Sequence, residues 1–180
     1  LYIDDTPALS IGSIRQRARA LQRAHGLGLV IVDHIGLVEG SAPRNTPRVD
    51  VLGDITDGLK NLAKDLQCHV VAVSQLSRAL EQRDDKRPTL SDLRASGRIE
   101  EGADAIVLLY RSHYYVRIPP TDEAKFRQWQ ADRDVCELIV AKNRHGPAGP
   151  SEILRVGADI TMGRFYDLSE HPSTQEEELP

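Results

Sequence analysis

The sequence predicts an α/β fold with a mostly parallel β-sheet flanked by helices and with antiparallel strands at the C-terminal end. Three short apolar runs, at 29–32, 70–74 and 105–110, are rich in Val, Ile and Leu, as strands buried in a parallel sheet are. Helical segments precede and separate these runs, and a strand–helix–strand order implies right-handed crossovers. Turn residues between later strands indicate an antiparallel hairpin that completes the sheet.

Composition narrows the class of protein. The chain has 180 residues, of which 40% are hydrophobic and 28% are charged, values typical of a globular protein that can bury a core. A net charge of −4 gives no global basic field, so any contact with nucleic acid must be local. Two cysteines without ligand spacing, no secretory signal and no apolar run of about 20 residues predict a cytoplasmic protein with no membrane segment. Because the chain starts in strand-like sequence without Met, we expect a fragment of a longer protein.

The first half of the chain contains two amphipathic helices. One begins at about Ser10, a typical N-cap residue, and ends at His25-Gly26. The second runs over about 49–66 and carries an apolar stripe at helical spacing, formed by Leu52, Ile55, Leu59, Leu62 and Leu66. A short strand is also expected at Tyr2-Ile3.

The second half adds a short helix at about 91–101, then an excursion at 114–133 with a helix at 122–130. Strands are expected at 135–141, 153–156 and 164–168. We therefore predict one partial domain over 1–168. Residues 169–180 are polar and acidic, which is typical of a disordered tail.

The strand at 29–32 ends in Asp33, and two interpretations of this carboxylate are open. Ligands bind at the carboxyl ends of strands in open α/β sheets, and in ATP-hydrolysing proteins an Asp at this place (Walker B) binds Mg²⁺. The alternative is an Asp that only caps the next turn.

Three other segments carry side chains suited to nucleotide or nucleic-acid chemistry. Gln75 ends the neighbouring strand and is able to bond a phosphate or water, or only to satisfy a turn. The segment 91–98 combines small residues with arginines, which suits a phosphate chain, and Arg78 lies in the basic loop that precedes it. Lys142 and Arg144 alternate at a strand end and are placed like an arginine finger, although a plain surface strand end has the same pattern.

Together these segments resemble the RecA-like motor domain of the DnaB-type replicative DNA helicases, in the order of that family, from Leu1 to about Leu168. The matching motifs are Val32-Asp33, Val73 to Arg83, Lys86-Arg87-Pro88, Ser91-Asp92-Leu93-Arg94, Gly97, Ile99-Glu100, Ala103-Asp104 and Lys142 to Pro147.

The resemblance implies roles for individual residues. Asp33 matches the Walker B Asp that helps to bind Mg²⁺, and Gln75 matches the polar sensor between nucleotide and DNA-binding loops. Lys142 and Arg144 match the pair that reaches the nucleotide of the neighbouring subunit, with Arg144 as the finger. In the DNA-binding loops the matching residues are Arg94, Gly97 and Arg78.

The activity implied is that of an ATP-dependent helicase, which unwinds duplex DNA as a homo-hexameric ring translocating on single-stranded DNA. ATP and Mg²⁺ are the implied cofactors, and primase and a helicase loader are the implied partners. The Walker A sequence GxxxxGK[ST] is absent, so the ATP site is incomplete and we expect this chain alone to be inactive. After Asp33 the family usually has Tyr-Leu-Gln-Leu, whereas this chain has His34-Ile35-Gly36-Leu37.

The sequence leaves two alternatives open. One is a RecA-like recombination or repair ATPase. The other is a non-catalytic DNA-binding or interaction remnant that lacks the phosphate loop.

Overall fold

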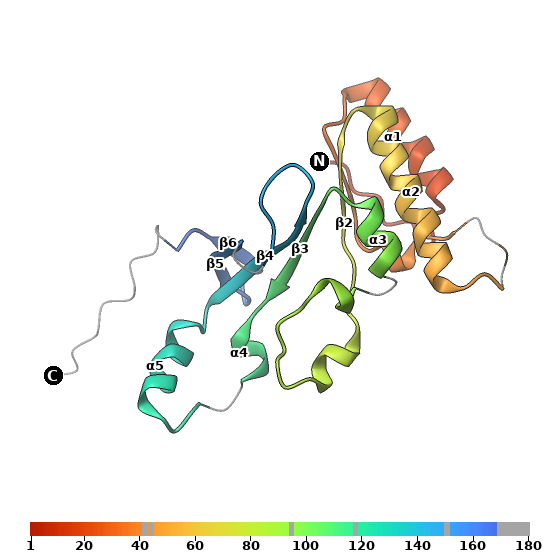
Figure 1. Ribbon diagram of the computed structural model, residues 1–180. Coiled ribbons are helices and arrows are strands. Elements are labelled where there is room, and N and C mark those ends of the chain that lie inside the picture. The colour runs from red at the N-terminus through yellow and green to blue at the C-terminus, as the bar shows by residue number, and fades with distance from the viewer. Residues whose placement is uncertain (41–42, 44, 94–95, 117–118, 150–151, 169–180) are drawn as a thin grey trace. The chain divides into compact units, whose positions relative to one another are not determined.

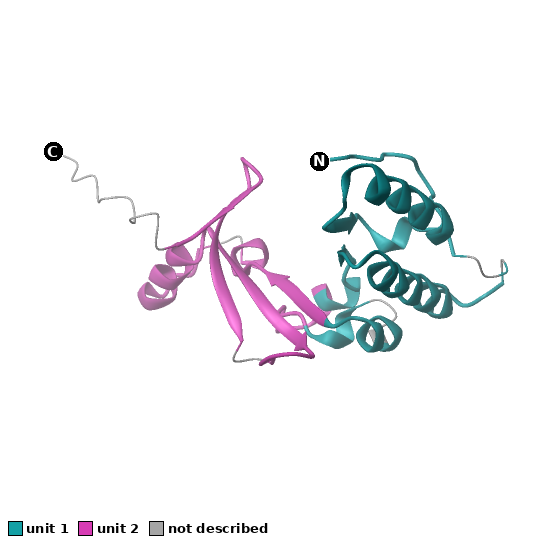
Figure 2. Cartoon of the chain, turned by 90° about the horizontal axis from the view of Figure 1, so that it is seen from above, with its two compact units in different colours: residues 1–80, 89–104 teal, residues 81–88, 105–180 magenta. Residues whose placement is uncertain are grey.

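The computed structural model describes residues 1–168 except 41–42, 44, 94–95, 117–118 and 150–151 (Figure 1). The predicted tail at 169–180 lies outside the described residues, and the boundary at 168 stays a prediction. The chain divides into two compact units, of which unit 1 contains residues 1–80 and 89–104 (Figure 2). Unit 2 contains residues 81–88 and the chain from 105 onward.

Unit 1 is built from two long helices that run side by side (Figure 1). Helix α1 (Ile11–His25) begins where predicted, because the Ser10 side chain accepts a hydrogen bond from the Ser13 N–H at 3.2 Å. It ends at Gly26, whose φ of 73° favours glycine. Helix α2 (Arg48–Leu66) buries all five residues of its predicted stripe.

A two-stranded parallel sheet packs on these helices. Strand β1 (Leu29–Val32) pairs with β2 (His69–Ala72), with Val30 opposite Val70. Those two valines contact a buried cluster from both helices and the turn that follows α2, made of Ala18, Leu62, Leu66 and Cys68. The core of unit 1 therefore lies between the helices and one face of the sheet.

The other face of this sheet is open, and we call it the open face. It is formed by side chains that are 42–61% exposed, those of Leu29, Ile31, Val71 and Val73. The apolar run of β1 predicted a strand buried on both sides, and this was wrong within the described residues: α1 and α2 both cover the Val30 face. The predicted strand at Tyr2-Ile3 is also absent, because these residues pair with no other described strand.

Unit 1 also contains α3 (Ser96–Gly102), which packs on α2, and two short 3₁₀ segments, η1 (Ile35–Leu37) and η3 (Leu90–Asp92). A third 3₁₀ segment, η2 (Arg78–Gln82), begins in unit 1 and ends in unit 2. None of the helices in the described ranges is long and apolar enough to cross a membrane.

Unit 2 contains a four-stranded antiparallel sheet in the order β3-β4-β5-β6. Its strands are β3 (Ala105–Tyr110), β4 (Val135–Asn143), β5 (Ile153–Asp159) and β6 (Arg164–Tyr166). The antiparallel C-terminal strands are thus confirmed. The sequence predicts that residues 105–110 form a strand of the parallel sheet, and this is wrong among the described strands. Strand β3 pairs antiparallel with β4, and Leu109 lies opposite Leu138. Its burial alternates, with Ile106 and Leu108 inside, as one covered face requires.

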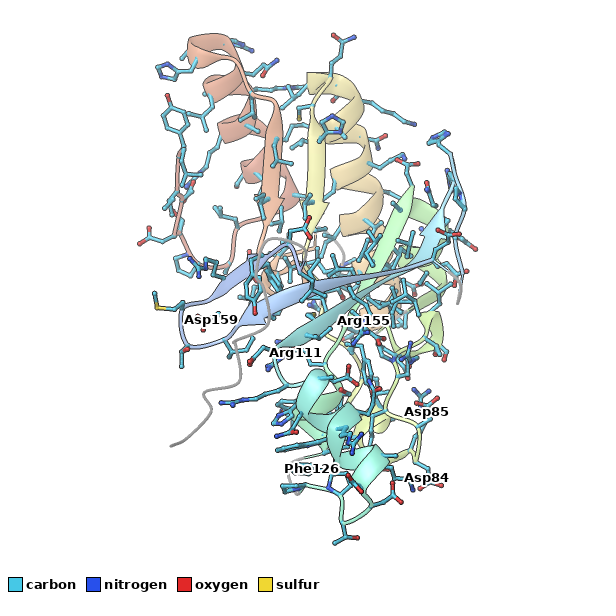
Figure 3. The ribbon with its side chains drawn as sticks, turned by 90° about the vertical axis from the view of Figure 1, so that its left-hand side faces the viewer. Asp84, Asp85, Arg111, Phe126, Arg155 and Asp159 are labelled. Atoms are coloured by element: carbon cyan, nitrogen blue, oxygen red, sulfur yellow. The ribbon has the colours of Figure 1, made fainter. Side chains whose placement is uncertain are left out.

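The excursion between β3 and β4 is held by aromatic contacts. It contains α4 (Ser112–Tyr115) and α5 (Glu123–Ala131), with Phe126 on α5 (Figure 3). The Trp129 ring lies 4.5 Å from that of His113, centroid to centroid, and its N–H donates to the Val116 carbonyl at 2.7 Å. Arg155 of β5 forms an ion pair with Asp132.

Both cysteines are buried, as predicted, and neither forms a disulfide. Burial raises the pKa of the Cys68 and Cys136 thiols above the usual value. Protonated thiols are poor nucleophiles, so these two side chains act as small apolar residues.

Candidate nucleotide and nucleic-acid site

Asp33 lies at the carboxyl end of β1 and its side chain is exposed. Its carboxylate makes no hydrogen bond or ion pair with the other described residues. The turn that follows is capped instead by His34, whose Nδ1 accepts from the Gly36 N–H at 3.1 Å. The capping interpretation of Asp33 is therefore not supported, and the carboxylate is available to a ligand.

Gln75 lies at the same sheet edge, as the parallel order of the strands predicts. β1 and β2 pair in parallel with Val32 opposite Ala72, and the Val73 N–H continues the ladder by donating to the Val32 carbonyl at 2.9 Å. The Gln75 amide nitrogen lies 3.4 Å from His34 Nε2. The structure thus brings together the two segments that follow β1 and β2.

The segment before the predicted DNA-binding loop is tied to the chain after Gln75. Leu76 forms a bridge with Leu93, and the Ser77 N–H donates to the Asp92 carbonyl at 2.7 Å. Asp92 is 6% exposed, and its carboxylate accepts hydrogen bonds from the Thr89 N–H at 2.8 Å and from the Thr89 hydroxyl at 3.0 Å. A buried carboxylate with these bonds holds the turn at 89–92 in one conformation.

Three residues were predicted to contact DNA. Arg94 lies outside the described residues. Gly97 is exposed on α3, and a Cβ added to it would meet nothing within 4 Å, so no part of the described chain requires glycine there. Arg78 is exposed at the start of η2 and forms no hydrogen bond or ion pair with the residues that the structure describes.

The other cations of the basic loop are used within unit 2. Arg83 donates to the Arg87 carbonyl at 2.9 Å, and Lys86 donates to the Glu81 carbonyl at 2.6 Å. Arg87 pairs with Glu137 at 2.9 Å, and its guanidinium carbon lies 5.1 Å from the centroid of the Tyr110 ring. These bonds hold the loop in its fold, and one of its cations, Arg87, is paired with a carboxylate.

Lys142 and Arg144 belong to unit 2. Lys142 is half-buried in β4 opposite Ile106, and Arg144 is exposed in the turn after the strand ends at Asn143. The Asn143 side chain accepts from the His145 N–H at 3.2 Å and donates to the Pro147 carbonyl at 3.4 Å. Because Arg144 is in this turn, strand alternation does not fix its direction relative to Lys142.

The donor set suits a magnesium ion that takes most of its ligands from elsewhere. No group of three metal-binding side chains occurs among the residues described. Mg²⁺ in phosphoryl-transfer sites is held by one or two carboxylates, with phosphates and waters as the other ligands. One unengaged carboxylate, Asp33, fits that role.

Sequence reasoning missed the contribution of two residues. His34 was noted only as a departure from the Tyr usual in the resembled family, although a polar residue two positions before Gly36 is a signal for a turn cap. Asp92 was noted only as part of the motif Ser91-Asp92-Leu93-Arg94, without a role of its own. The spacing from Thr89 to Asp92 is a capping-box pattern, which indicates a structural carboxylate.

Comparison with known families matches residues 1–162 to a family model described as the DnaB-like helicase C terminal domain. A replicative DNA helicase DnaB of Rickettsia felis is 46% identical over 155 residues, covering 82% of this chain and 31% of the relative. The corresponding helicase of Geobacillus stearothermophilus is 39% identical over 175 residues, which cover 96% of this chain and 36% of the relative. The chain therefore spans about a third of the length of these curated relatives.

Solved structures agree with the sequence comparison. One, described as a DnaB-like replicative helicase and its interactions with primase, superposes with a TM-score of 0.77 at 35% identity, covering 92% of this chain and 36% of that one. Another, the ATPase domain of G40P, gives 0.75 at 35% identity, covering 89% of this chain and 52% of that one.

Proposed function

This chain belongs to the DnaB-like helicase C-terminal domain family and has its RecA-like α/β fold, and from that premise we propose that it is the C-terminal part of an ATP-dependent replicative DNA helicase. The whole protein would unwind duplex DNA by translocating on single-stranded DNA as a homo-hexameric ring. The family match favours this function over a recombination ATPase or a non-catalytic remnant.

The observation that carries the proposal is the shared edge of β1 and β2. It holds the unengaged Asp33 carboxylate beside the segment of Gln75, and ligands bind at such strand ends in α/β sheets. When bound, ATP and Mg²⁺ would supply the phosphoryl group and neutralise its charge. Asp33 would hold the ion, and Gln75 would bond a phosphate oxygen or the attacking water.

The remaining roles concern charge. Lys142 and Arg144 would reach a nucleotide held by the neighbouring subunit, with Arg144 stabilising the charge of the transition state. Arg94, Gly97 and Arg78 would contact the backbone of single-stranded DNA. The phosphate loop would come from chain outside this sequence, so the chain alone would not turn over ATP.

We also propose the partners of the whole protein. One similar structure is described with primase, so primase is the first candidate, and a helicase loader is the second. Since its curated relatives are replicative helicases, we place its work in the cytoplasm with the DNA that it unwinds.

The test is the ATPase activity of the full-length protein with and without single-stranded DNA. We expect stimulation by DNA, and a loss of turnover of about a thousandfold in Arg144→Ala, the magnitude typical of an arginine finger, with nucleotide binding retained. Arg164→Ala, an exposed arginine of β6, is the control and keeps full activity. A wild-type protein without DNA-stimulated ATPase would refute the function, and normal turnover of Arg144→Ala would refute the finger.

A further inference from the structure

The His34 imidazole makes contacts through both of its nitrogens. On one side, Nδ1 accepts a hydrogen bond from the Gly36 N–H at 3.1 Å. A nitrogen that accepts carries no proton, so with Nδ1 accepting the ring N–H is assigned to Nε2. His34 therefore presents a donor on its other side.

That donor faces the amide of Gln75. His34 Nε2 lies 3.4 Å from the amide atom of Gln75 that is placed as Nε2. Two N–H groups do not bond each other, and the oxygen and nitrogen of an amide are assigned from the bonds they can make. The amide oxygen of Gln75 is therefore assigned to the side that faces His34, and both amide N–H groups then point away from the ring.

The backbone around His34 keeps the ring in this place. A Cβ on Gly36 would lie 2.7 Å from both Cε1 and Nδ1 of the ring, so only glycine leaves room for it. The Ile35 N–H donates to the Val73 carbonyl at 3.0 Å, and the Arg48 guanidinium donates to the Gly36 carbonyl. The turn is thereby bonded to the strand that leads to Gln75.

We propose that His34 is a positioning residue that orients the Gln75 amide, with its N–H groups directed to a phosphate oxygen or the attacking water. The inference rests on the proposed function and deepens it. Gln75 is followed by the bridge between Leu76 and Leu93, so the same contact links the strand end of Asp33 to the segment that precedes the DNA-binding loop. His34 itself need not touch nucleotide.

Two substitutions separate this role from that of a turn cap. In His34→Asn the shorter side chain still accepts from the Gly36 N–H, as asparagine does at caps, but it does not reach Gln75. In Gly36→Ala both partners remain, and the new Cβ displaces the ring. Gly12→Ala is the matched control, because its Cβ would be 3.7 Å from the nearest atom, Oγ of Ser10.

The experiment measures kcat and KM for ATP in the full-length protein with saturating single-stranded DNA. Loss of one neutral, partly exposed hydrogen bond predicts about a two- to fivefold fall in kcat for His34→Asn and for Gly36→Ala, with KM unchanged within about twofold. In a Gln75→Ala background neither substitution should lower kcat further, because the side chain that they disturb is gone.

The outcomes distinguish the two proposals. A wild-type protein whose ATPase is not stimulated by DNA overturns the proposed function and this inference with it. If DNA stimulates the wild-type ATPase but kcat is unchanged in His34→Asn and Gly36→Ala, the positioning role alone is overturned. It is also overturned if these substitutions lower kcat equally in the Gln75→Ala background.

Discussion

Replacing Asp92 by alanine should loosen the turn that precedes the predicted DNA-binding loop. The carboxylate is buried and accepts two hydrogen bonds from Thr89, one from the N–H and one from the hydroxyl. The backbone carbonyl of the same residue accepts from the Ser77 N–H. Asp92→Ala removes the two hydrogen bonds to Thr89. The hydrogen bond from the Ser77 N–H to the carbonyl of residue 92 then depends on a turn that is no longer held.

The magnitude follows from these contacts. Hydrogen bonds to a charged group contribute about 1.5–3 kcal/mol each when buried, but Thr89 is exposed and water replaces part of the loss. Loss of a capping side chain costs about 0.5–2 kcal/mol. We expect the free energy of opening of the segment 89–93 to fall by about 2 kcal/mol, which makes its open form about 30-fold more populated.

Amide hydrogen exchange in the full-length protein measures this change. The Ser77 and Leu93 amides, which donate to the carbonyls of Asp92 and Leu90, should exchange about 30-fold faster, because exchange follows local opening. The control is Ser91→Ala, because among the described residues the exposed Ser91 hydroxyl hydrogen-bonds to the Thr89 hydroxyl alone, at 2.8 Å. If protection in Asp92→Ala equals that of the wild type, the carboxylate does not hold the turn.

Three further predictions concern charge and packing. Arg94→Ala should weaken binding of single-stranded DNA and lower the slope of log K against log salt by about 0.7, the value for one lost phosphate contact. Gly157→Ala should lower the free energy of unfolding by about 1–3 kcal/mol, because its Cβ would lie 2.1 Å from the Tyr166 ring; urea unfolding measures it. The Arg17 guanidinium, which donates to Asp4, lowers the pKa of that carboxyl from 3.8 to about 2. A lowered carboxyl pKa stabilises the folded state above pH 3.8, and this is lost as the pH falls toward 2. The stability difference between wild type and Asp4→Asn, measured against pH, should therefore be small, constant near neutral pH and vanish near pH 2.

Each of these has a control in an exposed residue of the same type. Arg23→Ala, on the last turn of α1, should leave the salt slope unchanged, and equal slopes for Arg94→Ala and wild type would remove Arg94 from the DNA contacts. Gly12→Ala should retain the full free energy of unfolding. If Gly157→Ala retains it as well, the Tyr166 ring moves without cost and the close contact does not require glycine. Asp5→Asn, a change at an exposed neighbouring residue, should retain the neutral-pH stability of the wild type; a difference for Asp4→Asn that grows toward pH 2 would reverse the expected sign.

The helices of unit 1 could be predicted from sequence because their signals are local. Ser10 and Gly26 mark the ends of α1, and the stripe from Leu52 to Leu66 spans one face of α2. The burial of strands could not be predicted in the same way. An apolar run such as that of β1 indicates that a strand can be covered on both sides, whereas the surfaces that cover it belong to other segments.

The candidate site divides along the same line. Parallel pairing alone predicts that Asp33 and Gln75 lie near each other, because neighbouring parallel strands end at the same edge of the sheet. The contact of His34 with Gln75 joins side chains 41 residues apart, and no periodicity encodes such a contact. The hydrogen bond from the Ser77 N–H to the Asp92 carbonyl likewise joins segments that are distant in sequence.

The open face of the β1–β2 sheet has a consequence for how this protein should be handled. A sheet of two strands has two unpaired edges, and here one face also exposes four aliphatic side chains, those of Leu29, Ile31, Val71 and Val73. Unpaired edges beside exposed apolar surface are templates for strand addition between molecules. Preparations of this chain alone should therefore form aggregates whose amount rises with protein concentration, and light scattering should be checked before any loss of activity is assigned to a substitution.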